Sequence, residues 1–209
     1  FSCTRKAGSQ GLAKLAAHFP SLKEAWSAPA PALARAGLTA ENAQMVADAR
    51  RSIDADALWE KFSASGIALV TRQEEAYPKL LRNIIDAPYA LYVRGTLPRE
   101  NEKLIAIVGT RRPTAYGKEA ARYLARELAR AGFSIVSGMA IGLDAVAIAS
   151  GIEEGGRAYG VLGCGVDVPY PAQNQPLARR VVEHGALISE FAPGVERLAA
   201  RAEAPVVPA

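Results

Sequence analysis

Two adjacent arginines, Arg111 and Arg112, follow an apolar run that ends at Gly109, in the stretch IAIVGTRRPTAYG of residues 105–117. Guanidinium groups donate paired hydrogen bonds that match phosphate oxygens. A glycine allows close backbone approach, and a helix that begins after the loop offers free N–H groups to an anion. The stretch therefore favours a phosphate-binding turn at the end of a strand. Turn geometry beside a solvated arginine pair is the competing interpretation of this loop alone.

Three more polar loops that contain glycine follow apolar runs: SGMAIGLD at 137–144, GCGVDVPYPAQN at 163–174 and SEFAPG at 189–194. The carboxyl ends of parallel strands meet at one edge of a sheet, where ligands bind in such folds. We therefore expect all four loops to share one rim. Together they indicate a binding site more strongly than any single loop does.

Nucleotide cofactors and catalysis find little support in these loops. The first loop has neither a GxGxxG pattern nor a GxxxxGK[ST] pattern, which counts against a dinucleotide and excludes a P-loop. Ser137, Asp144 and Glu190 fall on the rim without a nucleophile–base pair, and Asp144 is better interpreted as a helix cap or loop brace. Cys164 is better interpreted as a small packed residue than as a reactive thiol. We predict no catalytic residue, no metal site and no cofactor.

Aromatic side chains near the rim could stack a nucleic-acid base. Tyr116 and Tyr170 are the two candidates, although packing is the better interpretation of either one alone. Arg122, Arg126 and Arg130 recur at helical spacing further along the chain, with Glu119 and Glu127 close by. Because this stripe lies along a helix, it predicts a solvated face with ion pairs.

The elements that must position these loops form a β-α-β pattern. The predicted strands are 104–108, 133–137, 159–162 and 186–189, and the predicted helices are 116–131, 144–154 and 174–184. Nearly continuous apolar strands that alternate with helices predict an α/β fold with a parallel sheet covered on both faces. Ahead of them, GIALVT at 66–71 predicts a short strand and YALYV at 89–93 predicts an edge strand.

Short helices are expected over residues 10–65, with Thr39 as one N-cap. The predicted domains are therefore 1–65, which is helical, and 66–209, which carries the sheet. The chain begins with Phe1, so we expect a fragment. It has no apolar span of membrane length and no signal-peptide pattern, which predicts a cytoplasmic protein that is not bound to a membrane.

Composition restricts the mode of binding. The 209 residues are 50% hydrophobic and carry a net charge of +4. Neither half of the chain is strongly basic, so a nucleic-acid footprint must be a local patch. The two cysteines, Cys3 and Cys164, form no CxxC pair, which argues against a disulfide framework or a zinc site.

The four loops and the preceding connector, YPKLLRNIIDAPYALYVRG at 77–95, occur in the order and spacing of a known family. From Tyr77 to Gly194 the chain resembles the DNA-processing protein A (DprA/Smf) family. The resemblance implies an extended Rossmann-like sheet preceded by a small helical SAM-like domain. It also implies a homodimer without enzymatic activity that binds single-stranded DNA without sequence preference. In natural transformation such a protein protects incoming DNA and loads the RecA recombinase during recombination.

The resemblance also assigns roles to residues. Arg111 occupies the position of the loop arginine that contacts DNA phosphate, and the positions that shape the pocket are Gly109, Thr110, Tyr116, Gly117, Ser137, Gly138, Gly142 and Asp144. The candidate DNA-binding and phosphate-binding set is completed by Arg112, Gly163, Gly165 and Asn174.

The chain departs from the family pattern in three places. Ile141 stands where the second loop of the family has a basic DNA contact, and Ile148 stands at a usual histidine. After residue 194 the basic stretch of the family is missing, so we expect truncation at the C-terminal end and place homodimer formation in question. Loss of one phosphate contact lowers DNA affinity.

Two alternatives therefore stay open. One is a family member that has lost DNA binding. The other is a Rossmann-fold nucleotide-processing enzyme, similar to nucleoside monophosphate hydrolases, although the sequence GCGVD lacks the PGGxGTxxE loop of such enzymes.

Overall fold

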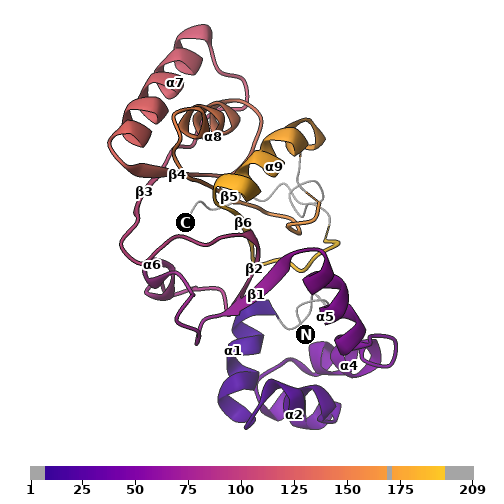
Figure 1. The fold of residues 1–209 in the computed structure, drawn as a ribbon. Coiled ribbons are helices and arrows are strands. Elements are labelled where there is room, and N and C mark those ends of the chain that lie inside the picture. Colours follow the sequence, from indigo (N-terminus) through magenta and orange to yellow (C-terminus); the bar gives the residue numbers. More distant parts are fainter. Residues whose placement is uncertain (1–7, 169–170, 196–209) are drawn as a thin grey trace. The chain divides into compact units, whose positions relative to one another are not determined.

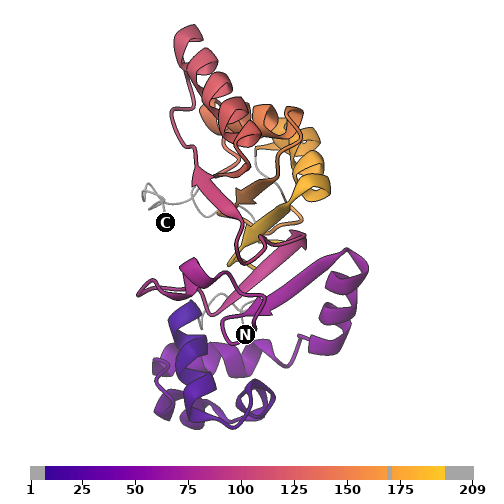
Figure 2. The same cartoon turned by 60° about the vertical axis from the view of Figure 1, so that its left-hand side comes forward.

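A computed structural model describes residues 8–168 and 171–195 (Figures 1 and 2). The chain divides into two compact units. The first unit comprises residues Phe1–Ser65 and Val70–Leu91, and the second comprises Gly66–Leu69 and Tyr92–Ala209. The segment 70–91 thus groups with the helices, while the domain boundary at residue 65 stays a prediction. No helix in the described part of the chain is long and apolar enough to cross a membrane.

The first unit is built of short helices: α1 (Gly8–His18), α2 (Leu22–Ser27), α3 (Ala30–Arg35), α4 (Ala40–Ala49), α5 (Ala55–Ala64) and α6 (Lys79–Arg82). Side-chain oxygens satisfy free N–H groups where helices begin. Thr39 caps α4 by accepting from the Asn42 N–H, as predicted, and Asp54 caps α5. A buried cluster that includes Leu15, Leu33 and Val46 holds this unit together.

The second unit alternates strands and helices: β3 (Lys103–Ala106), α7 (Ala115–Arg130), β4 (Phe133–Ser137), α8 (Leu143–Glu153), β5 (Ala158–Val161), a 3-10 turn (Ala172–Asn174), α9 (Gln175–His184) and β6 (Ala186–Ser189). With β1 (Ile67–Thr71) and β2 (Ala90–Gly95), the strand order of the sheet is β1-β2-β6-β5-β4-β3. Strands β3, β4, β5 and β6 are parallel neighbours. The predicted α/β fold class is confirmed.

Two predictions about the sheet are wrong. Strand β2 is not an edge strand, because it lies between β1 and β6, and it pairs with β6 antiparallel through Val93 and Ile188. The helices do not cover both faces: α7, α8 and α9 all lie on one face in the described part of this unit (Figure 2). Each strand from β3 to β6 is added on the same side of the previous one. Right-handed crossovers in one direction place every helix on one face.

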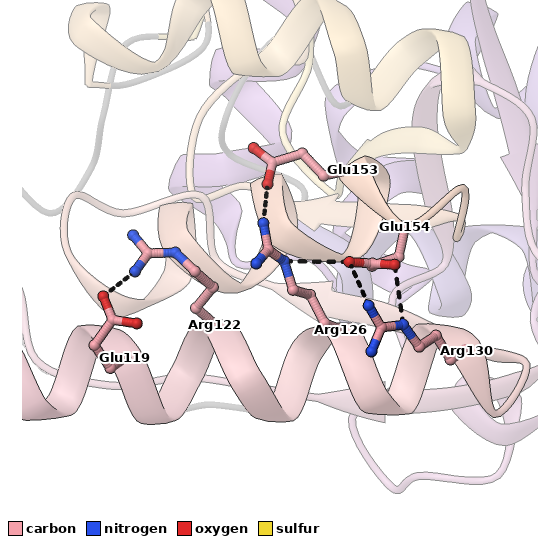
Figure 3. Close-up of polar contacts among 6 residues, drawn as sticks. All are labelled: Glu119, Arg122, Arg126, Arg130, Glu153 and Glu154. Carbon is pink, nitrogen blue, oxygen red and sulfur yellow. Dashed lines mark hydrogen bonds and ion pairs between the residues drawn. The ribbon is translucent and has the colours of Figure 1, made fainter.

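The predicted arginine stripe on α7 forms ion pairs, and it also links two helices (Figure 3). Within α7, Glu127 pairs with Arg130. Across to the end of α8, Arg130 Nε lies 3.1 Å from Glu154 Oε2, and Arg126 Nε lies 3.3 Å from Glu154 Oε1. Arg126 also pairs with Glu153 at 3.1 Å. Glu154 therefore joins two arginines that would otherwise repel each other.

Replacing this shared acceptor, Glu154→Gln, is expected to lower the free energy of unfolding by about 1 kcal/mol, the upper range for exposed ion pairs. Urea unfolding at low and high salt measures the loss, which should shrink as salt screens the wild-type network. Glu183→Gln on the exposed side of α9 is the matched control. Equal stability of the two variants would contradict the role of Glu154.

A second polar cluster lies at the amino ends of the strands. The Glu102 carboxylate accepts hydrogen bonds of 2.6 Å from both the Ser134 hydroxyl and the Tyr159 hydroxyl. Arg157 Nε lies 3.3 Å from the same carboxylate, whose side chain is only 9% exposed. Burial by itself would raise the pKa of Glu102, but these hydrogen bonds, the Arg99 N–H and the charge of Arg157 together lower it. The ionised carboxylate therefore binds three elements together.

Candidate functional site

The first and second loops are bonded to each other through Asp144, at the start of α8. Its carboxylate accepts the Gly109 N–H at 3.2 Å and the Ala140 N–H at 3.4 Å, and the side chain is buried. Asp144 thus acts as the predicted loop brace. The Leu143 N–H also donates to the Thr110 carbonyl at 3.2 Å. These bonds fix the loop that carries Arg111 and Arg112 onto the loop that follows β4.

Gly142 is required where these two loops touch. Its φ is +93°, and a β-carbon there would lie 2.3 Å from the Thr110 carbonyl oxygen. Any other residue would meet both the conformational penalty and the clash. This position in the second loop therefore serves backbone packing.

The second and third loops are joined by Asn174, just before α9. The Asn174 side-chain amide donates to the carbonyls of Met139 at 2.8 Å and Ala140 at 3.2 Å. Met139 has a φ of +58°, in the left-handed region that non-glycine residues rarely adopt, and is 1% exposed. Asn174 therefore holds an unfavourable backbone conformation in place.

The third and fourth loops are joined by Asp167, which sequence analysis did not single out. Its two carboxylate oxygens each lie 2.9 Å from the Gly194 nitrogen. The Gly165 N–H donates to the Val195 carbonyl at 2.9 Å, and the Ser189 hydroxyl donates to the Leu162 carbonyl at 3.0 Å. Aspartate in a turn commonly accepts nearby backbone N–H groups, which marks Asp167 as a candidate brace but does not identify its distant partner. The four predicted loops are thus linked in series along one rim.

The candidate residues separate into two groups. Ser137, Gly142, Asp144, Gly165 and Asn174 brace the loops from within. The candidates that are exposed are Gly109, Thr110, Arg111, Arg112, Tyr116, Gly138 and Gly163. Gly117 donates its N–H to Thr114 Oγ1 at 3.1 Å and so belongs to the cap of α7. Contact of these residues with DNA stays a prediction. Tyr170 lies outside the described residues.

The positive charge of the rim comes from the first loop. The guanidinium groups of Arg111 and Arg112 are exposed and have no hydrogen bond or ion pair with any residue that the structure describes. They stand beside the N-terminal end of α7, whose first turn has no acidic residue. Helix N-termini favour anions. The second loop contributes no positive charge, because Ile141, which is 37% exposed, occupies the position where a cation was expected. The arrangement can therefore hold a phosphate through the first loop.

Two rim side chains that could act as nucleophiles, Ser137 and Cys164, make structural contacts instead. The Ser137 hydroxyl donates to the Ile107 carbonyl at 2.6 Å, and Cys164 is 3% exposed with its thiol directed at the Val168 carbonyl. Both side chains are held in structural contacts. Cys164 is thus packed in a turn, as interpreted from the sequence.

Replacing the central brace, Asp144→Asn, is expected to lower the free energy of unfolding by about 1–2 kcal/mol, because an amide accepts only one of the two N–H groups well. Hydrogen exchange at Gly109 and Ala140 is the direct measurement, and it should accelerate in the variant. Asp56→Asn, in the exposed first turn of α5, is the control. Unchanged protection of both amides would show that Asp144 does not hold the loops.

Comparison with known proteins adds independent information. Residues 68–203 match the family model described as DNA recombination-mediator protein A. Protein Smf of Synechocystis sp. is 35% identical over 188 residues, which are 88% of this chain and 47% of that protein. The DNA processing protein DprA of Bacillus subtilis is 40% identical over 134 residues, 63% of this chain and 45% of that protein. The chain therefore spans about half the length of these relatives.

Solved structures agree with the sequence relatives. The crystal structure of DprA from Streptococcus pneumoniae superposes with a TM-score of 0.71 at 25% identity, covering 93% of this chain and 68% of that one. DprA from Helicobacter pylori, whose single-stranded DNA binding mode has been studied structurally, superposes with a TM-score of 0.56 at 30% identity. That match covers 64% of this chain and 60% of the other.

Proposed function

Because the chain belongs to the DNA recombination-mediator protein A family, we propose that it binds single-stranded DNA by holding backbone phosphates at the rim of its four loops. The observation that carries this proposal is the exposed pair Arg111 and Arg112, free of protein partners within the described residues and placed on a braced loop. Phosphate contacts of this kind carry no base information. The binding is therefore insensitive to sequence.

We further propose a biological role for this DNA binding. The chain protects incoming single strands and loads RecA onto them during natural transformation, in the cytoplasm and as a homodimer. Family membership supports this role. Recruitment of RecA requires a protein surface as well as the rim, and sedimentation of the chain with RecA and DNA tests that surface separately from DNA binding.

Fluorescence anisotropy with a labelled oligothymidine of about 20 nucleotides tests the DNA-binding proposal at about 50 and 200 mM salt. We expect binding at the lower salt and a marked loss at the higher salt, because displaced counterions drive the association. The affinity for a duplex of the same length is measured for comparison. Absence of binding at the lower salt would contradict the proposal.

Restoring a cation in the second loop, Ile141→Arg, is expected to tighten oligothymidine binding several-fold and to steepen the salt slope by about 0.7, the value for one phosphate on a single strand. Ile141→Gln is the uncharged control. If neither the wild type nor the arginine variant binds, the rim itself has lost the function. A gain with glutamine equal to that with arginine would show that charge is not the cause.

A further inference from the structure

The outer face of α7, defined by Tyr116, Ala120, Tyr123 and Leu124, points away from the core of the second unit. Tyr116 is 83% exposed, Tyr123 is 66% exposed and Leu124 is 52% exposed. The opposite side of the helix buries Ala121 and Ala125. Seven residues rotate an α-helix by nearly two full turns, so Tyr116 and Tyr123 lie on the same line, about 10 Å apart along the axis. Exposed aromatic rings in a row are unusual on a solvated helix.

The charges around this face suit a polyanion. Lys118 is exposed and has no ion pair with any described residue, as with Arg111 and Arg112 in the loop just before the helix. The acidic residues on the helix are already neutralised, since Glu119 pairs with Arg122 (Figure 3) and Glu127 pairs with Arg130. The unpaired charge at this end of α7 is therefore positive.

We propose that a single strand bound at the rim continues along the outer face of α7, where Tyr123 stacks on a base. The inference rests on the proposed function and extends it by a second binding residue beyond the loops. Aromatic side chains beside cations are the usual platform for unpaired bases, because every base offers a π-face for stacking. Tyr116 lies between Tyr123 and the arginine loop, on the same line of α7, and so connects the two. The spacing of about 10 Å equals roughly three stacked nucleotides at 3.4 Å each.

Oligothymidines of about 5 and about 20 nucleotides separate the rim from its extension. Tyr123→Ala is expected to weaken binding of the longer strand about fivefold or more, the lower end for loss of one stacked base, and to leave the shorter strand unchanged. Tyr123→Phe keeps the ring and should restore affinity. Leu80→Ala, which removes an exposed apolar side chain from α6, is the control and should have little effect. Because Tyr123 is exposed, the thermal midpoint should not change.

The outcomes distinguish this inference from the function on which it rests. If the wild type binds and Arg111→Ala weakens that binding while Tyr123→Ala does not, the strand leaves the rim by another route and the inference is wrong. If Tyr123→Ala alters self-association in sedimentation but not DNA affinity, the face is a protein interface and the inference is again overturned. If the wild type binds neither strand, the proposed function fails first.

Discussion

Replacing Arg111 with alanine is expected to weaken oligothymidine binding about tenfold, since a charged hydrogen bond contributes roughly 1.5 kcal/mol or more. The guanidinium is exposed and has no partner in the described protein, so its loss removes a phosphate contact without disturbing the fold. The salt slope should also flatten by about 0.7, the value for one phosphate on a single strand. Anisotropy at a series of salt concentrations measures both changes.

Two controls identify the cause. Arg35→Ala, at an exposed position in α3, makes the same change in net charge in the helical unit, which contains none of the candidate rim residues. Arg111→Lys keeps the charge but not the planar fork, so an intermediate affinity is expected. The role of Arg111 would be contradicted if Arg35→Ala weakened binding as much, because net charge alone would then explain the loss. Arg112→Ala reports the contribution of the neighbouring guanidinium in the same way.

Removing the carboxylate at the amino ends of the strands, Glu102→Ala, is expected to lower the free energy of unfolding by about 2–4 kcal/mol. The Ser134 and Tyr159 hydroxyls would lose their acceptor, and the charge of Arg157 would lose its partner. Buried polar groups without partners are costly, whereas the burial of the one lost methylene group contributes less. Urea unfolding followed by circular dichroism measures the change.

The same carboxylate predicts a pH dependence. The pKa of Glu102 is lowered in the folded state despite burial, by hydrogen bonds from Ser134 and Tyr159, the Arg99 N–H and the charge of Arg157. A lowered pKa adds stability above the unfolded value of about 4.3, and this stability is lost as the pH falls through the folded value. The stability difference between wild type and Glu102→Ala should therefore be constant from about pH 5 upward and shrink below about pH 4.

An exposed carboxylate provides the comparison for this experiment. Glu190→Ala, in the fourth loop, removes the same group from a position that is open to solvent. It should change stability little, because substitutions at exposed positions remove few contacts. A constant difference between wild type and Glu102→Ala down to about pH 3 would contradict the lowered pKa.

The alternation of strands and helices could be predicted because it depends on neighbouring residues. The strands 133–137 and 186–189 were predicted with their observed bounds, and the other elements of the second unit lie within about two residues of their predictions. Each is an apolar run of strand length or a helix that a glycine follows within two residues, such as Gly132 after α7, whose φ is +81°. The position of β2 inside the sheet could not be predicted, because an apolar strand does not specify its partners.

In the site, too, some features could be predicted from the sequence and others could not. Parallel strands bring their carboxyl ends together, so the rim of four loops, the arginine pair and the missing cation at Ile141 could be predicted from the order of elements. The braces that hold the rim, such as Asp144 to Gly109 and Asp167 to Gly194, join residues far apart in the chain. A side chain's sequence position does not reveal which distant N–H group it will accept.

The sequence by itself determined the fold class, the loops and the charges they carry, because these follow from local composition and period. Only the tertiary structure decided which polar residues point inward as braces and which remain free for a ligand. It left Arg111 and Arg112 exposed, directed Ser137 and Asp144 inward and left Tyr123 exposed on α7. The physical reason is that exposure and hydrogen bonding depend on what packs nearby, and packing joins segments that are distant in the chain.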